Sequence, residues 1–401
     1  MSRRLPFLSL AASLAASLAV SASAQPVSPL GASVVDMHYA DAELVVPPTE
    51  EFLKIFPSAT RLPDNVLTVE MEAAAARFES EWGGLPQIAL SEGSRLNVGA
   101  SGPRVANLRV RLGLAPGSQF DAELGSRIAA YRAAHDLAGG THADNRLIAS
   151  LNRGHNYYRS LIDLNLKRFK RLPSDLGERY ALVDLTTQTL KMVENGQTVD
   201  SMKVVIGKPS TQTPVMAGIL RYSVLNPYWN VPFDLAQSSV ARKYLAQGRP
   251  YLKRTGFQVL DDSGAVMDPA SVDWRGAAAG QTQITVRQLP GPGNGMGAIK
   301  FMFPNALGIY LHDTPSRALF DKQQRMFSAG CIRVEDHARL STWLYGERPR
   351  AIGSAPEQRV DIPDPVPVYV AYFTAVPTAD GFDFREDIYS RDAPRLAMMG
   401  N

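Results

Sequence analysis

One cysteine and one histidine stand out as residues that could do chemistry together. Cys331 is the only cysteine in the 401-residue chain, and His312 lies 19 positions before it. A lone thiol has no disulfide partner within the chain, and small neighbours with a histidine on a nearby element favour its use as a nucleophile. Acyl transfer at an amide needs a nucleophile, a base within reach and donors for the oxyanion. We therefore expect Cys331 to be the nucleophile and His312 the base.

The residues around Cys331 fit this chemistry. Gly330 lets the backbone pass close to a substrate, and the amides around Gly330 and Cys331 are expected to point at the developing negative charge. A helix is predicted just after the cysteine, with Asp336 as its cap and Leu340, Trp343 and Leu344 as its buried face. If Cys331 lies near the N-terminus of that helix, the helix dipole favours thiolate.

The segment around His312 indicates what lies beside it. Alternation along a strand over 309–313 places Tyr310 and His312 on one face and Asp313 on the other. Tyr310 is therefore the expected neighbour in the site, and a backbone carbonyl or a side chain other than Asp313 is expected to orient His312. The other candidate base is His337, which opens the predicted helix and fits better as a solvated first-turn residue.

Strand patterns from Arg179 onward predict the elements that position these residues. The Asn195-Gly196 pair predicts a type I′ turn, so the strands before and after it are expected to form an antiparallel meander. Residues 233–281 interrupt the strand rhythm with a helical piece and several turns, and such an insertion over an active site commonly acts as a lid. The strand pattern resumes at 283–288.

Helical patterns occupy the chain before the strands. A helix over 64–82 is predicted to be capped by Asp64 or Asn65. A compact three-helix module and a connecting helix follow, with expected helices over 103–112, 121–135, about 147–151 and 155–173.

The first 24 residues predict export. Arg3 and Arg4 precede an apolar stretch, and Ala22-Ser23-Ala24 forms a small-residue cleavage site, which together indicate a secretory signal peptide. An uncleaved anchor is the alternative, but the apolar run contains serines and is shorter than the roughly 20 residues of a spanning helix. Removal of Arg3 and Arg4 with the signal peptide takes the formal charge from +3 to +1. A charge this close to zero does not indicate nucleic-acid binding.

Three segments then resemble a known family. They are GPGNxxGxIKFMFPN at 291–305, IYLHDTP at 309–315 and SxGCIR at 328–333, and they resemble the L,D-transpeptidases with their YkuD-type catalytic domain. The resemblance is closest to the large periplasmic branch of Gram-negative bacteria. Many family members carry histidine where this chain has Ala329, but that branch also has a small residue there. Residues 93–152 resemble the small peptidoglycan-binding module of cell-wall enzymes, although a plain three-helix spacer remains an alternative.

The resemblance implies an α+β fold. It comprises a mainly antiparallel, YkuD-like β-sandwich with an inserted lid, and a three-helix peptidoglycan-binding domain. The expected divisions are a signal peptide (1–24), a lead-in with a scaffold helix (25–92), the peptidoglycan-binding domain (93–152), a connecting helix (153–178) and the catalytic domain (179–395, with the lid at about 233–281).

The resemblance also implies the reaction. Cys331 would attack the carbonyl of the third residue of a peptidoglycan tetrapeptide stem, release D-alanine, and pass the acyl group to an amine of a second stem, giving a 3→3 cross-link in the periplasm. Catalytic roles fall to Cys331, His312, Gly330 and Tyr310, and substrate-binding roles to Arg333, Ser328, Trp229 and Asn305. Each of three residues also has an alternative role. Arg333 could equally pair with an internal acid, Ser328 could serve only to shape the turn, and Trp229 could belong to the apolar core.

Other functions remain open at this stage. An L,D-carboxypeptidase or a protein-to-peptidoglycan transferase would use the same Cys331 and His312, because water and amines attack the same thioester. A non-enzymatic wall-binding scaffold is an alternative of another class. The sequence has neither HExxH nor paired-cysteine spacing, so no metal or other cofactor is expected, and no membrane span is expected after signal cleavage.

Overall fold

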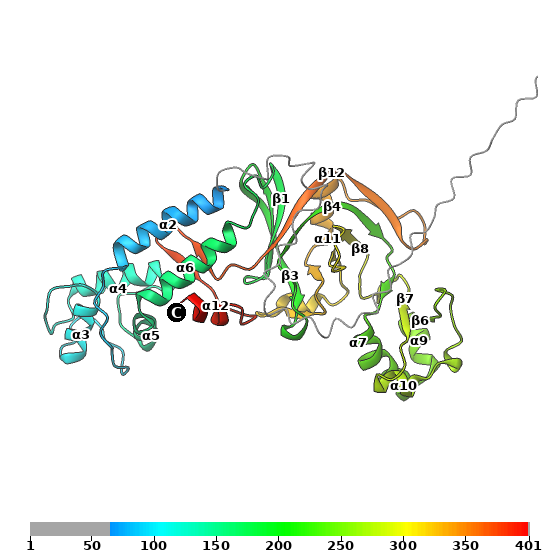
Figure 1. The fold of residues 1–401 in the computed structure, drawn as a ribbon, viewed down its shortest axis with the longest axis horizontal. Helices are drawn as coiled ribbons and strands as arrows, with labels where there is room; N and C mark the ends of the chain where they lie inside the picture. The colour runs from blue at the N-terminus through cyan, green and yellow to red at the C-terminus, as the bar shows by residue number, and fades with distance from the viewer. Residues whose placement is uncertain (1–64, 400–401) are drawn as a thin grey trace, which may run out of the picture. The chain divides into compact units, whose positions relative to one another are not determined.

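The computed structural model describes residues 65–399, which combine N-terminal helices with a barrel-like β-sheet (Figure 1). The predicted signal peptide (1–24), Asp64 and most of the lead-in lie outside the described residues. Within the described part of the chain, no helix has both the length and the apolar character needed to cross a membrane.

Three of the N-terminal helices begin at a residue whose side chain caps them. Asn65, Asp121 and Asp144 each accept a hydrogen bond from the backbone N–H three residues ahead, as a helix N-cap does. Asn65 is thus one of the two caps that the sequence predicts. The helices are α2 (Val66–Trp82), α3 (Pro103–Arg111), α4 (Ala122–Ala134), α5 (Asn145–Arg153) and α6 (His155–Phe169).

These helices share one core with the end of the chain. Phe373 and Phe382, which follow the last long strand, are buried in the same cluster as Phe78 and Ile128. The short strands β13 (Ala375–Pro377) and β14 (Phe382–Phe384) form a hairpin there, and α12 (Asp392–Met399) packs on α6. His135 is buried in this core, and burial lowers its pKa to about 3, so it is neutral and structural.

A nine-stranded sheet is formed by the part of the chain from Arg179 onward. Its order is β10-β3-β11-β9-β8-β4-β12-β1-β2, and β2 also pairs with β3, which closes the sheet on itself. The predicted β-sandwich is therefore corrected to a barrel-like sheet. The strands are β1 (Arg179–Asp184), β2 (Thr189–Glu194), β3 (Gln197–Gly207), β4 (Met216–Leu225), β8 (Ile299–Met302), β9 (Leu311–His312), β10 (Met326–Ser328), β11 (Ile332–Val334) and β12 (Gln358–Ala371).

The sheet is mainly antiparallel, as predicted. β1, β2 and β3 form the expected meander, and Asn195 and Gly196 take the positive φ values of 51° and 75° that a type I′ turn needs. Parallel pairs join β1 to β12, β10 to β3 and β11 to β9. The helix α11 (His337–Tyr345) packs Leu340 and Leu344 against the core of this sheet.

The inserted segment is larger than the sequence predicts. It has its own apolar core and a three-stranded sheet of β5 (Trp229–Asn230), β7 (Thr285–Gln288) and β6 (Phe257–Leu260). The strand predicted near 283–288 thus belongs to the insertion and not to the barrel, because alternation shows that a strand forms but not which sheet it joins. The helical pieces are α7 (Phe233–Leu235), the π-helix η2 (Ala236–Ala241), α8 (Arg242–Gln247), α9 (Arg249–Thr255), η3 (Pro269–Ser271) and α10 (Trp274–Ala279).

Candidate active site

A tight turn between β10 and β11 carries Cys331. Gly330 has a φ of +122°, a conformation that a side chain would strain. Ser328 Oγ donates to the carbonyl of Cys331 at 2.6 Å and accepts the N–H of Gly330 at 3.1 Å. Thr213 Oγ1 donates to the carbonyl of Gly330 at 2.7 Å. These bonds fix the backbone on both sides of the thiol.

The predicted oxyanion donors are only partly available. The N–H of Gly330 already donates to Ser328, so it is not free for a substrate. Among the described residues, the N–H of Cys331 has no hydrogen-bond partner. The candidate backbone donor is therefore the amide of Cys331 alone.

The predicted link between Cys331 and a helix N-terminus is wrong. Asp336 does cap α11, accepting from the N–H groups of Ala338 and Arg339, but β11 separates the cysteine from this helix. Burial raises the pKa of the Cys331 thiol, and hydrogen bonds from the backbone and phenol of Tyr310 offset only part of that rise. The resting residue is therefore a thiol.

His312 is buried, with 1% of its surface exposed, and is held in one orientation. Its Nδ1 lies 2.6 Å from the carbonyl oxygen of Asp313, so Nδ1–H is the donor and Nε2 keeps its lone pair. A backbone carbonyl thus orients the ring, which is one of the two kinds of partner that the sequence led us to expect. Burial, together with the nearby charge of Arg333, lowers the pKa of His312 to about 3, which keeps the imidazole neutral.

Tyr310 joins the two predicted catalytic residues. Its ring centroid lies 5.8 Å from that of His312, and its phenol interacts with Cys331. The parallel pairing of β9 with β11 places His312 opposite Arg333. Cys331 directly precedes β11, so it lies close to this pair. The thiol points to the carbonyl of Gly308 at 3.8 Å, and no hydrogen bond joins it to His312 within the described contacts. Such bonds are often long in free enzymes and tighten with substrate.

Asp313 lies behind His312 and anchors the strand end. Its carboxylate accepts the N–H of Ala298 at 2.8 Å, lies 3.2 Å from Nδ1 of His337, and pairs with Arg317 of the short helix η4 (Arg317–Asp321). Burial acts to raise the pKa of Asp313, but the hydrogen bonds from His337 and from Ala298 outweigh it and bring the pKa to about 2. His337 is therefore half-buried beside a fixed anion rather than solvated.

Arg333 lies near the thiol without an acidic partner. Its Nε is buried and makes no hydrogen bond, and no ion pair joins Arg333 to an acid within the described residues. Burial lowers its pKa, and a negative charge on Cys331 acts the other way when the thiol ionises. The alternative of an internal acid is thus not seen in the described part of the chain.

The other predicted substrate-binding residues make structural contacts. Asn305 uses its side-chain amide for four backbone bonds, to Phe303, Leu307 and Ile309, and thereby shapes the loop before β9. Trp229 lies in the insertion, 6.1 Å from the ring of Phe257, and no described contact joins it to Cys331.

Sequence reasoning missed Thr213. This fully buried residue follows the short helix η1 (Pro209–Thr211), accepts the N–H of Gly207 at 2.9 Å and donates to Gly330, 117 positions away. No local pattern indicates a contact over that separation. A threonine after the end of a strand is typical of an ordinary turn, so the local sequence does not indicate its role.

The comparisons with known proteins agree with this site. Residues 178–368 match the family model described as YkuD, the L,D-transpeptidase catalytic domain. A curated relative from Haemophilus influenzae, named "Putative L,D-transpeptidase", is 30% identical over 269 residues. The alignment covers 64% of this chain and 54% of the relative, so the chain spans about half the length of that relative.

Solved L,D-transpeptidases also match. A mutant of the Enterococcus faecium enzyme is 12% identical, covers 52% of this chain and 64% of that chain, and has a TM-score of 0.26. L,D-transpeptidase 3 of Mycobacterium tuberculosis is 14% identical, with 48% of this chain and 60% of that chain covered and a TM-score of 0.25. The Mycobacterium smegmatis enzyme is 13% identical, with 48% of this chain and 58% of that chain covered and a TM-score of 0.20. TM-scores this low carry no inference.

The family match and the curated relative agree on one class: the catalytic domain that this part of the chain resembles is that of a cysteine-dependent transpeptidase family. Residues 178–368 are thus similar to the YkuD L,D-transpeptidase family.

Proposed function

We propose that the protein is an L,D-transpeptidase that makes 3→3 cross-links in peptidoglycan. The observation that carries this proposal is the convergence of Cys331, Tyr310 and an oriented, neutral His312 within a region similar to the YkuD family. In the proposed reaction the thiol attacks the carbonyl of the third residue of a tetrapeptide stem. D-alanine leaves as the thioester forms, and an amine of a second stem then attacks the thioester.

The protonation states suggest the order of proton transfers. The thiol and the imidazole are both neutral at rest, so the proton leaves Sγ of Cys331 for Nε2 of His312 as the sulfur attacks. The imidazolium then gives this proton to the departing amine of D-alanine. In the second half, His312 takes a proton from the acceptor amine as it attacks, and returns it to Sγ of Cys331 as the C–S bond of the thioester breaks. The N–H of Cys331 supports the oxyanion, and Arg333 holds a substrate carboxylate.

The remaining expectations are part of the same proposal. The first 24 residues act as a cleaved signal peptide and deliver the chain to the periplasm. Residues 93–152 bind peptidoglycan, and the insertion that follows β4 acts as a lid over the site. The three helices α3, α4 and α5, of which α4 and α5 are capped by aspartates, and the separate apolar core of the insertion support these assignments.

The products of one reaction test the proposal. The purified chain and its Cys331→Ser variant are incubated with disaccharide-tetrapeptide, and the products are followed by mass spectrometry. Cross-linked dimer with loss of D-alanine, absent from the variant, is the expected result. Tripeptide without dimer would instead make the protein an L,D-carboxypeptidase, and the same dimer yield from the variant would exclude Cys331 as the nucleophile.

A further inference from the structure

The carbonyl that orients His312 belongs to a residue whose side chain is held as well. The backbone oxygen of Asp313 accepts the Nδ1–H of His312 at 2.6 Å, and Asp313 is only 5% exposed. Its carboxylate accepts the N–H of Ala298 at 2.8 Å and pairs with Arg317. Because the carbonyl and the carboxylate are joined through one Cα, a change in the contacts of the carboxylate also shifts the carbonyl that meets the imidazole.

The space around this carboxylate is closed on the side of β8. A Cβ placed on Gly297 would collide with the carboxylate of Asp313. Gly297 also has a φ of +64°, a conformation that glycine adopts without strain. The glycine thus leaves room for the carboxylate and for nothing larger, so the position of Asp313 depends on the groups that bind it.

His337, the first residue of α11, contacts the same carboxylate, and its tautomer follows from its neighbours. Its Nδ1 lies 3.2 Å from Oδ1 of Asp313, and its Nε2 lies 3.1 Å from Nη2 of Arg348. A guanidinium group only donates, so Nε2 of His337 is the acceptor and Nδ1 carries the proton. Nη2 of Arg317, 3.5 Å from this Nδ1, donates to Asp313 instead. The Nδ1–H of His337 therefore donates to the carboxylate of Asp313.

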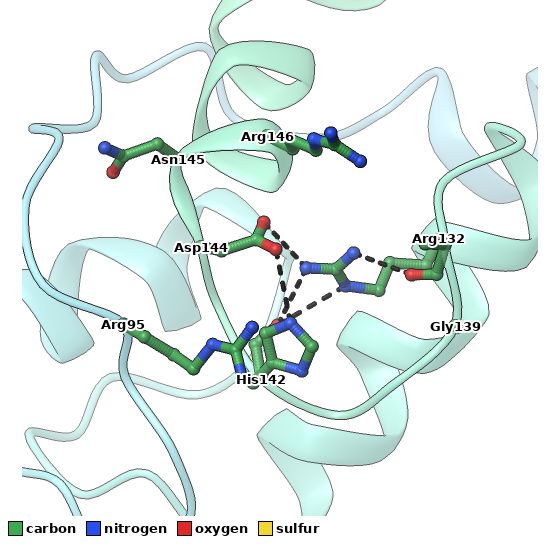
Figure 2. Close-up of a pocket in the computed structure, with 8 residues that line it drawn as sticks. Arg95, Arg132, Gly139, His142, Asp144, Asn145 and Arg146 are labelled. Atoms are coloured by element: carbon green, nitrogen blue, oxygen red, sulfur yellow. Dashed lines mark hydrogen bonds and ion pairs between the residues drawn. The ribbon is translucent and has the colours of Figure 1, made fainter.

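Two other histidines of the described chain lie beside a carboxylate, and they show what is particular to this pair. Figure 2 shows His142 and Asp144 at a pocket of the helical region, 3.2 Å apart, where Asp144 also caps α5. His155 lies 2.8 Å from Glu79 of α2. The carbonyls of Asp144 and Glu79 bond to backbone N–H groups, whereas that of Asp313 bonds to the proposed catalytic base.

We propose that His337 is a positioning residue for the acyl transfer and acts on His312 through Asp313. The Nδ1–H of His337 holds the carboxylate, the carboxylate fixes the backbone of Asp313, and the carbonyl of Asp313 keeps the proton of His312 on Nδ1. Nε2 of His312 then stays free to take the proton of the Cys331 thiol. The catalytic part of this inference rests on the proposed function, whereas the effect on the tautomer of His312 does not.

Three variants separate a correctly placed donor from the bulk of the imidazole. Asparagine at 337 presents an N–H near the place of Nδ1, glutamine reaches the place of Nε2, and alanine presents neither. We expect kcat to fall about tenfold in His337→Ala and His337→Gln with little change in KM, because the base is misplaced while the substrate contacts remain. His337→Asn should restore most of kcat. His155→Ala removes a histidine–carboxylate pair between α2 and α6 and should keep the parent kcat.

The tautomer of His312 gives a second readout that needs no turnover. Nitrogen NMR of the chain with isotope-labelled histidine reports which ring nitrogen carries the proton, and loss of signals in His312→Gln identifies those of His312. The parent, His337→Asn and His155→Ala should show a proton on Nδ1 alone, and His337→Ala and His337→Gln a mixture of tautomers.

The two readouts distinguish a failure of this inference from a failure of the proposed function. A mixture of tautomers in His337→Ala, in a protein that makes no cross-links, would support the link from His337 to His312 and reject the proposed reaction. A single unchanged tautomer in His337→Ala would overturn the inference whatever its kcat. Equal losses of kcat in the asparagine and alanine variants would also overturn it, because the imidazole would then act by its bulk.

Discussion

Cys331 is held against the phenol of Tyr310 and near a histidine that burial keeps neutral, so the resting site contains a thiol and an imidazole rather than an ion pair. A neutral pair avoids the cost of burying two charges before the substrate arrives. It also makes His312 a true base for the attack, because the proton must leave the sulfur during the reaction. Reactivity toward simple alkylating agents should then be low at neutral pH.

The Tyr310→Phe variant tests this protonation state. The wild-type thiol pKa lies above the ordinary value, so the rate of alkylation by iodoacetamide should still be rising at pH 9. The phenol of Tyr310 acts to lower that pKa, and its removal should shift the profile to higher pH. The pH dependence of alkylation measures both effects, with Tyr157→Phe as a distant control. A wild-type midpoint near pH 6 would contradict a resting thiol.

Local alternation was enough to predict several features of this site. It gave the face shared by Tyr310 and His312, and it indicated that the Asp313 carboxylate points away from the ring. It could not predict that Gly330 donates to Ser328, or that His337 lies against Asp313. Those contacts depend on how a tight turn closes and on how α11 packs. Neither feature produces a periodic pattern of residues from which it could be predicted.

At the scale of elements, the nucleophile turn depends on the segment that follows β3. Thr213 bridges the N–H of Gly207 and the carbonyl of Gly330, and Tyr389 donates to the carbonyl of Gly207 at 2.6 Å. The position of Cys331 is thus set by residues from three separate parts of the chain. A small change in this bridge should move the thiol relative to His312.

The Thr213→Val variant removes the bridge and nearly preserves the side-chain shape. It leaves two buried backbone groups without partners, which should cost about 1–3 kcal/mol of stability. We also expect a fall in kcat that exceeds any change in KM, because the turn is misplaced while the substrate contacts remain. Thr213→Ser keeps the hydroxyl and should restore kcat. If the valine variant turns over at the wild-type rate, Thr213 does not position the turn.

The sequence predicted the meander but not the extent of the insertion. The Asn195-Gly196 pair specifies its turn through the positive φ values that it tolerates. By contrast, β7 alternates like a barrel strand yet pairs with β5 and β6 in the insertion. The closure of the barrel by β2 and β3 depends on the three-dimensional path of the sheet, so alternation alone could not distinguish it from a sandwich.

At the scale of the whole described chain, a buried polar cluster joins the first helices to the chain end. Arg168 of α6 pairs with Asp392 of α12 at 2.5 Å, and Asp392 also accepts from Thr374. Asn165 donates to Thr374 from the same helix. Because this cluster links residues more than 200 positions apart, it ties the helical region to the segment that continues the sheet.

Arg168→Met tests that coupling. The variant leaves Asp392 buried without its cation, which should lower the free energy of unfolding by about 3–5 kcal/mol. Arg359→Met removes an exposed arginine that pairs with Asp361 and should change it by less than about 1 kcal/mol. Urea unfolding followed by circular dichroism measures both. Equal stability of the two variants would show that the cluster does not couple the helices to the chain end.

The most direct test of the account is the mass of the acyl-enzyme. The purified chain is mixed with tetrapeptide stem, quenched in acid at short times, and its intact mass and peptide map are measured beside those of Cys331→Ser and His312→Gln. The account predicts an adduct on Cys331 equal to the stem without its D-alanine, absent from the serine variant and much slower to form in the glutamine variant. An adduct on another residue, or one that persists in Cys331→Ser, would contradict it.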